Sequence, residues 1–550
     1  MIGIISFVGF TLLVAIIAYL ATRKTDETSS DGYFLGGRSL TAGVIAGSLL
    51  LTNLSTEQIV GLNGSAYKDG LSVMAWETLA AIAMVVTAIF LLPRYLKGGL
   101  TTIPQFLAKR FDVTTKTITS GLFLTGYVVV LLPVILYSGS VAISGMFNVP
   151  ELLGVSDKTA LVMCIWGIGI IGSIYAVFGG LKAVAVSDSI NAIGLIVGGL
   201  LIPVFGLMAI GDGNVLAGLD NLMTTNADRF DSTGEPGQEV PFSTIFTGMM
   251  LVQLFYWGTN QQIIQRALAA KNLAEGQKGL LLASFLKILG PLILVLPGMI
   301  AYHYFEGGLE TSDLAYPELV RAVLPKPLVG FFAAVLFGAI LSSFNSVLNS
   351  SVTLFGIDIY KQHIRPDAEE KTVVKYGKVF GVCLALAAMF IAPMIANAGS
   401  LFNYLQEING IYSIPILTVI VVGYLTKRVP SIAAKIGIFS GSILYIISQF
   451  FLKDHFVEKA ISAAKESGIT DASALRLIEA EAYPHYLHIM AILFVTNAVI
   501  MLLIGKFYPR KEPFKLEYTQ QVSIEPYRYL YPVGILICVI VIGIYIYFAK

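Results

Sequence analysis

The chain has 550 residues, of which 56% are hydrophobic and 13% are charged, and its mean hydropathy is +0.77. Ordinary globular proteins carry about 25% charged residues, so this composition excludes a soluble multidomain enzyme and a disordered scaffold. The net charge of +1 leaves no basic excess to meet phosphates, which excludes a nucleic-acid-binding protein. The remaining class is a polytopic membrane protein.

The cysteines and the missing nucleotide motif narrow the class further. Cys164, Cys383 and Cys538 lie in apolar stretches without a disulfide framework or metal-ligand spacing, so we interpret them as buried, inert thiols. The sequence contains no GxxxxGK[ST] motif and so gives no sign of ATP-driven pumping.

About fourteen segments match the roughly 20 apolar residues that a helix needs to cross a bilayer. We therefore predict an all-α protein with about fourteen transmembrane helices. The segments lie near residues 2–22, 41–66, 71–93, 117–148, 158–178, 182–209, 243–260, 278–305, 328–360, 372–397, 401–426, 431–452, 485–507 and 528–549. The first lacks a basic leader and a small-residue cleavage site, so we interpret it as a retained helix.

The lysines and arginines favour one orientation. With the N-terminus outside, 25 of the 36 lie in cytoplasmic loops or the span ends beside them, 10 lie outside, and Lys287 lies within a span. Because cytoplasmic loops are enriched in these residues, we predict an even number of spans with both termini outside the cytoplasm. The chain is then a multi-pass protein of the plasma (inner) membrane.

Two predicted outer loops, 210–242 and 453–484, are long and polar. The first is acidic and rich in Gly, Asn and Thr, and the second contains two stretches that predict short amphipathic helices. An external lid is one interpretation of these loops, and we favour plain solvated loops.

Polar residues interrupt the second span at its middle. They are Thr52, Asn53, Ser55, Thr56, Glu57 and Gln58. A helix that is broken at mid-membrane frees carbonyl groups, which can coordinate a cation. Two separate short helices are the alternative, but Ile59–Ala66 is too short to span alone.

Charged residues within spans are the next signal, because a charge at the helix centre costs about 2.5–3.5 kcal/mol on insertion scales. The third span carries Glu77, and the eighth carries Lys287 with no other charged residue within seven positions. Lys287 therefore needs a partner from another helix, from water or from a substrate. A Lys–Glu pair that only joins two helices is the alternative to a binding role.

The ninth span has the densest polar stripe. Its members are Ser342, Ser343, Asn345, Ser346, Asn349 and Ser350. Such residues often form small polar contacts between helices, but they also suit Na⁺, which prefers several oxygen ligands. The hydroxyls of Ser342 and Ser343 with the carbonyl of Ala339 would give three oxygens, and the break at Leu51–Leu54 would give two more.

Two further spans carry polar residues. Gln406 and Glu407 lie in the middle of the eleventh span and suggest a turn that faces a cavity. Asp188 lies near the start of the sixth span, where a simple cytoplasmic-end charge is the equal alternative to a functional role.

These residues fall within strings that resemble one family. The strings are GYFLGGRSL, NLSTEQIVGLNGSAY, FGGLKAVAVSD, FYWGTNQQIIQRALAAK, AEGQKG, SSFNSVLNS and YLQEINGIYSIP. Over essentially its whole length the chain resembles the sodium/solute symporter family, and within it the bacterial sodium/galactose symporters. The resemblance implies an amino-acid-transporter-like (LeuT-type) fold of two five-helix repeats with inverted topology. The repeats would cover 41–209 and 243–426, with 1–22 and 431–550 as peripheral helices of one transporter domain.

The resemblance also implies site residues. The sodium ligands would be Leu51, Leu54 and Ala339 through carbonyls and Ser342 and Ser343 through hydroxyls. The sugar contacts would be Gln58, Glu77, Gln253, Lys287 and Gln406. The inner gate would be Tyr256, and the outer gate would be Leu62, Trp76 and Phe402. Some members have a second sodium site, which Asp188, Ser342 and Ser346 match.

The chain departs from the family pattern at four positions. The remaining serine of the second sodium site is Asn345 here. Gln253 stands in place of a sugar-contact Asn, Ala80 in place of a contact Ser, and Leu131 in place of a polar Asn. The predicted pocket is therefore less polar at its edges.

We predict a Na⁺-coupled importer of a small neutral polyhydroxylated solute, most simply a hexose such as galactose or glucose. Glu77 and Lys287 carry opposite charges, and we place no arginine at mid-span depth to receive a carboxylate. The alternatives are another cargo (inositol, an organic acid or proline), a membrane sensor with the same fold, and proton coupling.

Overall fold

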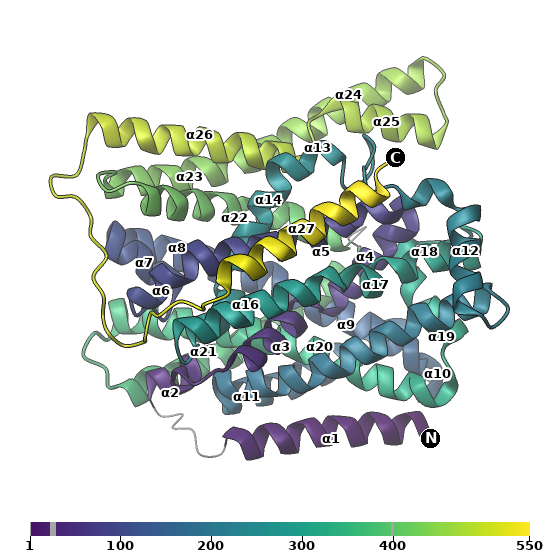
Figure 1. Cartoon of the computed structure of the whole chain (residues 1–550), viewed down its shortest axis with the longest axis horizontal. Helices are drawn as coiled ribbons and strands as arrows, with labels where there is room; N and C mark the ends of the chain where they lie inside the picture. The colour runs from purple at the N-terminus through teal and green to yellow at the C-terminus, as the bar shows by residue number, and fades with distance from the viewer. Residues whose placement is uncertain (1, 23–28, 398–400) are drawn as a thin grey trace.

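The structure, a computed structural model, describes residues 2–22, 29–397 and 401–550. Nearly all of these residues are helical, and the one β-bridge found among them, Leu40 with Ala270, belongs to no strand. The long helices run side by side along the longest axis of the molecule (Figure 1). The predicted all-α class is confirmed.

The first half of the chain forms the helices up to the first long loop. They are α1 (Ile2–Thr22), α2 (Ser30–Leu35), α3 (Ala42–Asn53), α4 (Thr56–Asp69), α5 (Ala75–Val86), α6 (Leu92–Lys97), α7 (Ile103–Arg110), α8 (Val113–Gly126), α9 (Leu132–Phe147), α10 (Val149–Leu153), α11 (Asp157–Ile210) and α12 (Val215–Thr225).

The second half contributes the remaining helices. They are α13 (Phe242–Thr244), α14 (Met250–Gly258), α15 (Gln261–Leu268), α16 (Leu273–Ile288), α17 (Gly290–Leu294), α18 (Leu296–Tyr304), α19 (Ala315–Val323), α20 (Lys326–Thr353), α21 (Glu370–Ile391), α22 (Leu401–Leu425), α23 (Ser431–Ile447), α24 (Lys453–Glu466), α25 (Ala472–Ala482), α26 (Tyr486–Phe507) and α27 (Leu530–Phe548).

The number of spans differs from the expected fourteen. Ten helices of the described chain are long and apolar enough to cross a membrane, or eleven if α16 and the helix after it, bent by 48°, form one span. Three expected spans fall short of that criterion. The side chains of the first are described only from Phe7, the second is divided between α3 and α4, and the seventh is non-helical at Thr247 (φ −118°, ψ −105°).

Irregular turns inside the long helices have local causes. Single π-helical turns at Thr87–Leu91 and Tyr127–Leu131 immediately precede α6 and α9, which carry Pro93 and Pro133 at their second positions. Proline lacks an N–H and clashes with the carbonyl four residues earlier, and a wider turn relieves both problems. The helix continues through each proline instead of ending there.

The 54-residue helix α11 is divided in two by Gly180. Its φ of 56° and ψ of −176° are not helical, and a side chain added there would contact the ring of Tyr33 at 3.2 Å. This φ is strained for a residue with a Cβ. Gly180 therefore separates the fifth and sixth spans, in agreement with the sequence.

Both termini lie at one end of the bundle. α1 begins and α27 ends there, beside α12, α24 and α25 (Figure 1). Lys550 donates its backbone N–H to Asp231 Oδ1 at 3.3 Å, so the C-terminus contacts the first long loop. A chain that crosses the membrane an even number of times has both termini on the same side. The two amphipathic helices expected in 453–484 are α24 and α25.

A buried arginine closes the opposite end of α22. Arg110 is fully buried and donates to the carbonyls of Gly423 (2.9 Å), Val429 (3.0 Å) and Thr426 (3.1 Å). The last carbonyls of a helix lack intrahelical partners, and a cation there also opposes the helix dipole. Burial, with Arg510 nearby, lowers the pKa of Arg110 to about 10, so the group stays charged at neutral pH.

Replacing Arg110 tests this cap. We expect Arg110→Ala to lower the free energy of unfolding by about 3 kcal/mol, because hydrogen bonds to a charged group are lost and buried carbonyls are left unsatisfied. Thermal unfolding of the purified protein measures the loss. Arg428→Ala removes the same charge from an exposed side chain nearby and should have little effect. Equal losses in the two variants would contradict the capping role.

Candidate functional site

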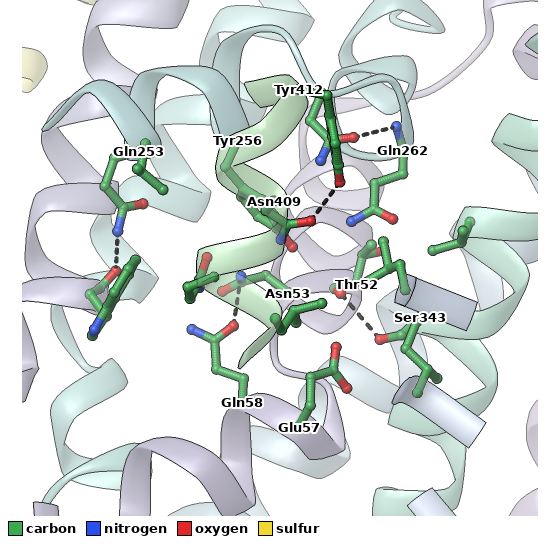
Figure 2. A pocket seen from close by; sticks show the side chains of 18 residues that line it. Thr52, Asn53, Glu57, Gln58, Gln253, Tyr256, Gln262, Ser343, Asn409 and Tyr412 are labelled. Atoms are coloured by element: carbon green, nitrogen blue, oxygen red, sulfur yellow. Dashed lines mark hydrogen bonds between the residues drawn. The ribbon is translucent and has the colours of Figure 1, made fainter. Parts of the chain in front are cut away.

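Two interrupted helices meet at the centre of the bundle. α3 ends at Asn53 and α4 begins at Thr56, while α14 ends at Gly258 and α15 begins at Gln261. Side chains from both interruptions face one cavity, together with residues of α20 and α22 (Figure 2). The lining residues are Thr52, Asn53, Glu57, Gln58, Trp76, Leu131, Ile135, Val252, Gln253, Tyr256, Asn260, Gln262, Ser343, Val347, Leu405, Gln406, Asn409 and Tyr412.

A chain of polar contacts runs outward from this cavity. Asn53 Nδ2 donates to Gln58 Oε1 at 2.8 Å, and Gln58 Nε2 donates to Glu77 Oε1 at 2.6 Å. Glu77 Oε2 in turn accepts from Lys287 Nζ at 2.5 Å. Glu77 and Lys287 are buried, so the ion pair is shielded from water. The pair therefore lies one residue behind the cavity wall and holds Gln58 in place.

The bend between α16 and α17 makes room for that ion pair. A Cβ on Gly290 would overlap Glu77 Oε2, so a larger residue at this position would displace the carboxylate. The ammonium group of Lys287 also lies 5.6 Å from the ring centre of Trp257, within cation–π range. Lys287 thus has its charge partner and an aromatic neighbour inside the protein.

Gln253 is oriented by two hydrogen bonds. Its Nε2 donates to the carbonyl of Trp76 at 2.8 Å (Figure 2), and its Oε1 accepts from Trp257 Nε1 at 3.1 Å. A side-chain amide held at both ends presents a fixed edge to the cavity. This arrangement joins α14 to α5.

The interruption at Leu54 and Ser55 frees backbone carbonyls. The N–H of Ser55 donates to Asn53 O (2.8 Å), and the N–H of Gln58 donates to Ser55 O (3.1 Å). In an uninterrupted helix these two N–H groups would bind the carbonyls of Leu51 and Leu54, four residues earlier. The two carbonyls that the sequence proposed as cation ligands therefore lose their helical partners.

The serines expected beside those carbonyls lie close to the break. Ser343 Oγ donates to the carbonyl of Thr52 at 3.2 Å (Figure 2). Ser342 Oγ is buried and forms no hydrogen bond of ordinary length within the described residues, although the carboxylate of Asp188 lies beside it. Its lone pairs remain able to bind an oxygen-seeking cation.

Arg266 lies where the sequence analysis expected only oxygen ligands. Its guanidinium group is fully buried, donates to Ser346 Oγ, and lies 3.9 Å from Asp188 Oδ2. Arg266 Nε also donates to Ser48 Oγ at 3.1 Å, and Ser48 donates to Asp188 at 2.7 Å. The sequence placed Arg266 at the end of a span, and the structure buries it inside the bundle, because α15 is a short helix packed within the bundle. Arg266 is not among the residues that line the cavity.

The structure brings part of the expected site together. Gln58, Gln253 and Gln406 line the cavity, as do Trp76 and Tyr256 of the expected gates. Glu77 and Lys287 are linked to the cavity only through Gln58. Leu62 is fully buried on α4 outside the lining, and Phe402 lies in the start of α22, outside the side chains that the structure describes.

Several lining residues were missed as site candidates. Asn409 and Tyr412 follow Gln406 at three-residue intervals, and Tyr412 Oη donates to Asn409 Oδ1 at 2.6 Å. That spacing places them on one helix face and could have identified them. Asn260 caps α15 and accepts from Tyr127 Oη at 2.6 Å. No local pattern in the sequence predicts this contact.

A comparison with protein families decides the assignment. The sodium:solute symporter family model matches residues 33–444. The chain belongs to the sodium:solute symporter family. It is thus a secondary transporter and not an enzyme, and Na⁺ is its co-transported ion.

Several relatives align with most of the symporter. It is 46% identical to the uncharacterized symporter YidK of Escherichia coli (strain K12) over 98% of this chain and 90% of that protein. It is 33% identical to the sodium/glucose cotransporter of Vibrio parahaemolyticus (79% and 83% covered) and 30% identical to human sodium/myo-inositol cotransporter 2 (80% and 68% covered).

Solved structures show the fold of the symporter. A Na⁺-coupled sialic acid symporter in a substrate-bound outward-open state aligns with a TM-score of 0.71 at 18% identity, over 93% of this chain and 99% of that one. The nucleobase-cation symporter Mhp1 in a closed conformation aligns with a TM-score of 0.51 at 13% identity, over 86% and 95%. The expected LeuT-type fold is confirmed.

The ion pair of the symporter can be tested by a double-mutant cycle. Lys287→Ala should lower the free energy of unfolding by about 3–5 kcal/mol, because it leaves Glu77 as an uncompensated buried charge. Adding Glu77→Ala should restore part of the loss. Thermal unfolding in detergent provides the measurement.

Lys278→Ala is the matched control on the same helix. Its partner Glu275 is 3.1 Å away, but both side chains are partly exposed, and such surface pairs contribute only about 0–1 kcal/mol. A loss in Lys287→Ala no larger than in Lys278→Ala would show that the buried pair does not stabilise the fold.

Proposed function

We propose that the symporter imports a small neutral polyhydroxylated solute, such as a hexose, together with Na⁺. The observation that carries this proposal is the charge of the central cavity. Glu57 is the one acidic or basic side chain in its described lining. Its carboxylate is 8% exposed, and Oε2 has no hydrogen-bond partner among the described residues.

The lack of a cationic side chain in this described lining disfavours anionic cargo. A carboxylate substrate would leave water for a buried site that offers no partner of opposite charge, which is costly. Lys287 does not provide that partner, because its ammonium group is paired with Glu77. A neutral polyol instead finds an acceptor in Glu57 and both donors and acceptors in Gln58, Gln253 and Gln406.

The relatives point in the same direction. The proteins described as sodium/glucose and sodium/myo-inositol cotransporters both carry neutral, hydroxyl-rich solutes by name. The sialic acid symporter is similar in fold alone, so its anionic substrate carries no weight for this chain.

We place the sodium ion at the interruption of the second span. The proposed ligands are the carbonyls of Leu51, Leu54 and Ala339 and the hydroxyls of Ser342 and Ser343. The freed carbonyls and the buried hydroxyl of Ser342 support this set. Neutral ligands bind Na⁺ weakly, which suits an ion that must leave in every cycle.

We further propose one Na⁺ per cycle. The second site suggested by Asp188, Ser342 and Ser346 already contains a cation, since Arg266 donates to Ser346 and lies beside Asp188. One ion is sufficient. A potential of about 100 mV contributes about 2.3 kcal/mol and a tenfold gradient about 1.4 kcal/mol, enough for several-hundred-fold accumulation.

The repeats and gates complete the proposal. The paired interruptions, α3 to α4 and α14 to α15, support inverted repeats over 41–209 and 243–426, because such repeats place a broken helix in each half. Tyr256, whose ring lines the cavity, would form the inner gate. Leu62, Trp76 and Phe402 would form the outer gate.

Uptake by proteoliposomes tests the cargo. Labelled galactose, glucose, myo-inositol and proline are offered with and without an inward Na⁺ gradient. We expect Na⁺-driven accumulation of a hexose and none of proline. Galacturonate, which adds a carboxylate to the galactose ring, should compete at least tenfold more weakly than galactose, equivalent to about 1.4 kcal/mol.

The same assay with Glu57→Gln tests whether Glu57 contributes to the preference for galactose over galacturonate. Removing the ionisable carboxyl group should reduce the difference in how strongly the two compounds compete for uptake, even if uptake itself falls. If galacturonate outcompetes galactose in the natural protein, the proposed cargo is wrong although Na⁺ symport stands.

The sodium site is tested by Ser343→Ala. Loss of one ligand should raise the Na⁺ concentration for half-maximal uptake by about tenfold, equivalent to about 1.4 kcal/mol. Ser351→Ala is the control, because Ser351 donates only to Val347 on its own helix turn at 2.8 Å. Unchanged Na⁺ activation in Ser343→Ala would show that the ion lies elsewhere.

We also propose that both termini face the outside of the plasma (inner) membrane. A reporter that works only in the cytoplasm should be silent when fused at Lys550. The same reporter should be active when fused at Lys511, in the segment between α26 and α27 at the opposite end of the bundle. A strong signal at Lys550 would reverse the orientation.

A further inference from the structure

A second cavity lies at the end of the bundle where both termini are found. It is formed where the segment before α13 meets α24, α25 and the start of α26. Its wall is rich in groups of both charges and in aromatic rings. The residues that matter for its chemistry are Lys68, Glu479, Tyr483, His485, Tyr486 and His488.

This outer cavity is held in shape by contacts that do not involve its contents. His488 binds Ser243 Oγ through Nε2 at 3.1 Å and Thr247 Oγ1 through Nδ1 at 2.9 Å. Tyr483 Oη is 2.8 Å from Ser448 Oγ. Gly248 packs directly on the carbonyl of Leu487, since a Cβ there would overlap it. The wall of this cavity is therefore preformed in the absence of a ligand.

One buried polar atom in that wall is left without a partner. Tyr486 is 6% exposed, lines the cavity, and its Oη forms no hydrogen bond within the described residues. The acidic residues Glu239 and Glu407 also line this cavity. A buried hydroxyl of this kind is costly, and a ligand in the cavity would satisfy it.

The outer cavity adjoins the wall of the central one. Glu407 lines the outer cavity, and its neighbour Gln406 lines the central cavity. Lys453, the first residue of α24, binds Glu407 Oε1 at 2.7 Å, and Tyr445 Oη donates to the Glu407 carbonyl at 2.9 Å. The two cavities are thus lined by adjacent residues of α22.

We propose that this outer cavity binds a second molecule of the neutral polyhydroxylated solute before it enters the central cavity. The proposal rests on the proposed function for the class of solute. Lysine and tyrosine donors stand beside glutamate acceptors, as a ring of hydroxyls requires. The His485 and Tyr486 rings, 4.5 Å apart, provide an aromatic surface for the apolar face of such a molecule.

Protection of a thiol tests the outer site without using transport. Ala480→Cys places a thiol on its wall, and Ser467→Cys places one on an exposed part of the same pair of helices, away from the cavity. Both variants are labelled with a membrane-impermeant maleimide in Na⁺-free buffer, with galactose, myo-inositol or proline. Omitting Na⁺ leaves the central site, whose binding is coupled to the ion, unoccupied.

We expect galactose and myo-inositol to slow labelling of Ala480→Cys several-fold, and to leave Ser467→Cys unaffected. Adding Tyr486→Phe should weaken the protection. Tyr316→Phe removes another buried hydroxyl without a partner, on α19, and should not change it.

Three results would overturn the outer site: no protection in a protein that accumulates galactose, protection only in Na⁺, or equal protection by proline. Protection without any Na⁺-driven uptake of a neutral polyol has a different meaning. It would leave the outer site standing and refute the proposed function.

Discussion

The interruption of the helix at Leu54 and Ser55 is the constraint on which the centre of this protein depends. In a membrane interior every freed backbone group must find a partner within the protein or a ligand. Here one freed region is bridged by Ser343, which binds the carbonyl of Thr52. The carbonyls of Leu51 and Leu54 are left without their helical partners. The polar stripe of α20 is thus needed opposite the break, and the cavity opens beside it.

The other buried charges are arranged so that the cavity itself stays nearly free of them. Lys287 is neutralised by Glu77 and Arg266 lies beside Asp188, each pair on neighbouring helices away from the cavity surface. Such pairs add little net stability, but removing one partner is costly. They fix the orientation of α5, α11, α15 and α16 about their axes. That orientation determines which side chains face the cavity.

The sequence predicted features that depend on local composition. Polar residues within apolar runs identified the break in the second span and the serine stripe, and the bounds of two apolar segments separated the two halves of α11. Features that depend on how the helices pack could not be predicted from the sequence. The sequence suggested a Lys–Glu pair between two helices, and the packing of α16 against α5 brings Lys287 to Glu77. Arg266 looked like a residue at a span end, because nothing local shows that the eight-residue helix α15 is buried. The count of fourteen spans is not confirmed, because interrupted helices are too short to meet a length criterion.

Arg266 has a consequence for how charge is handled in the membrane. A diffusible ion leaves its site empty for part of each cycle, whereas a guanidinium group is attached to the chain. Asp188 therefore has a positive neighbour that is part of the chain, at the contact among α3, α11, α15 and α20. The protein therefore has a structural cation that belongs to its own chain as well as a co-transported cation. Only the occupancy of the co-transported ion depends on the Na⁺ concentration on either side of the membrane.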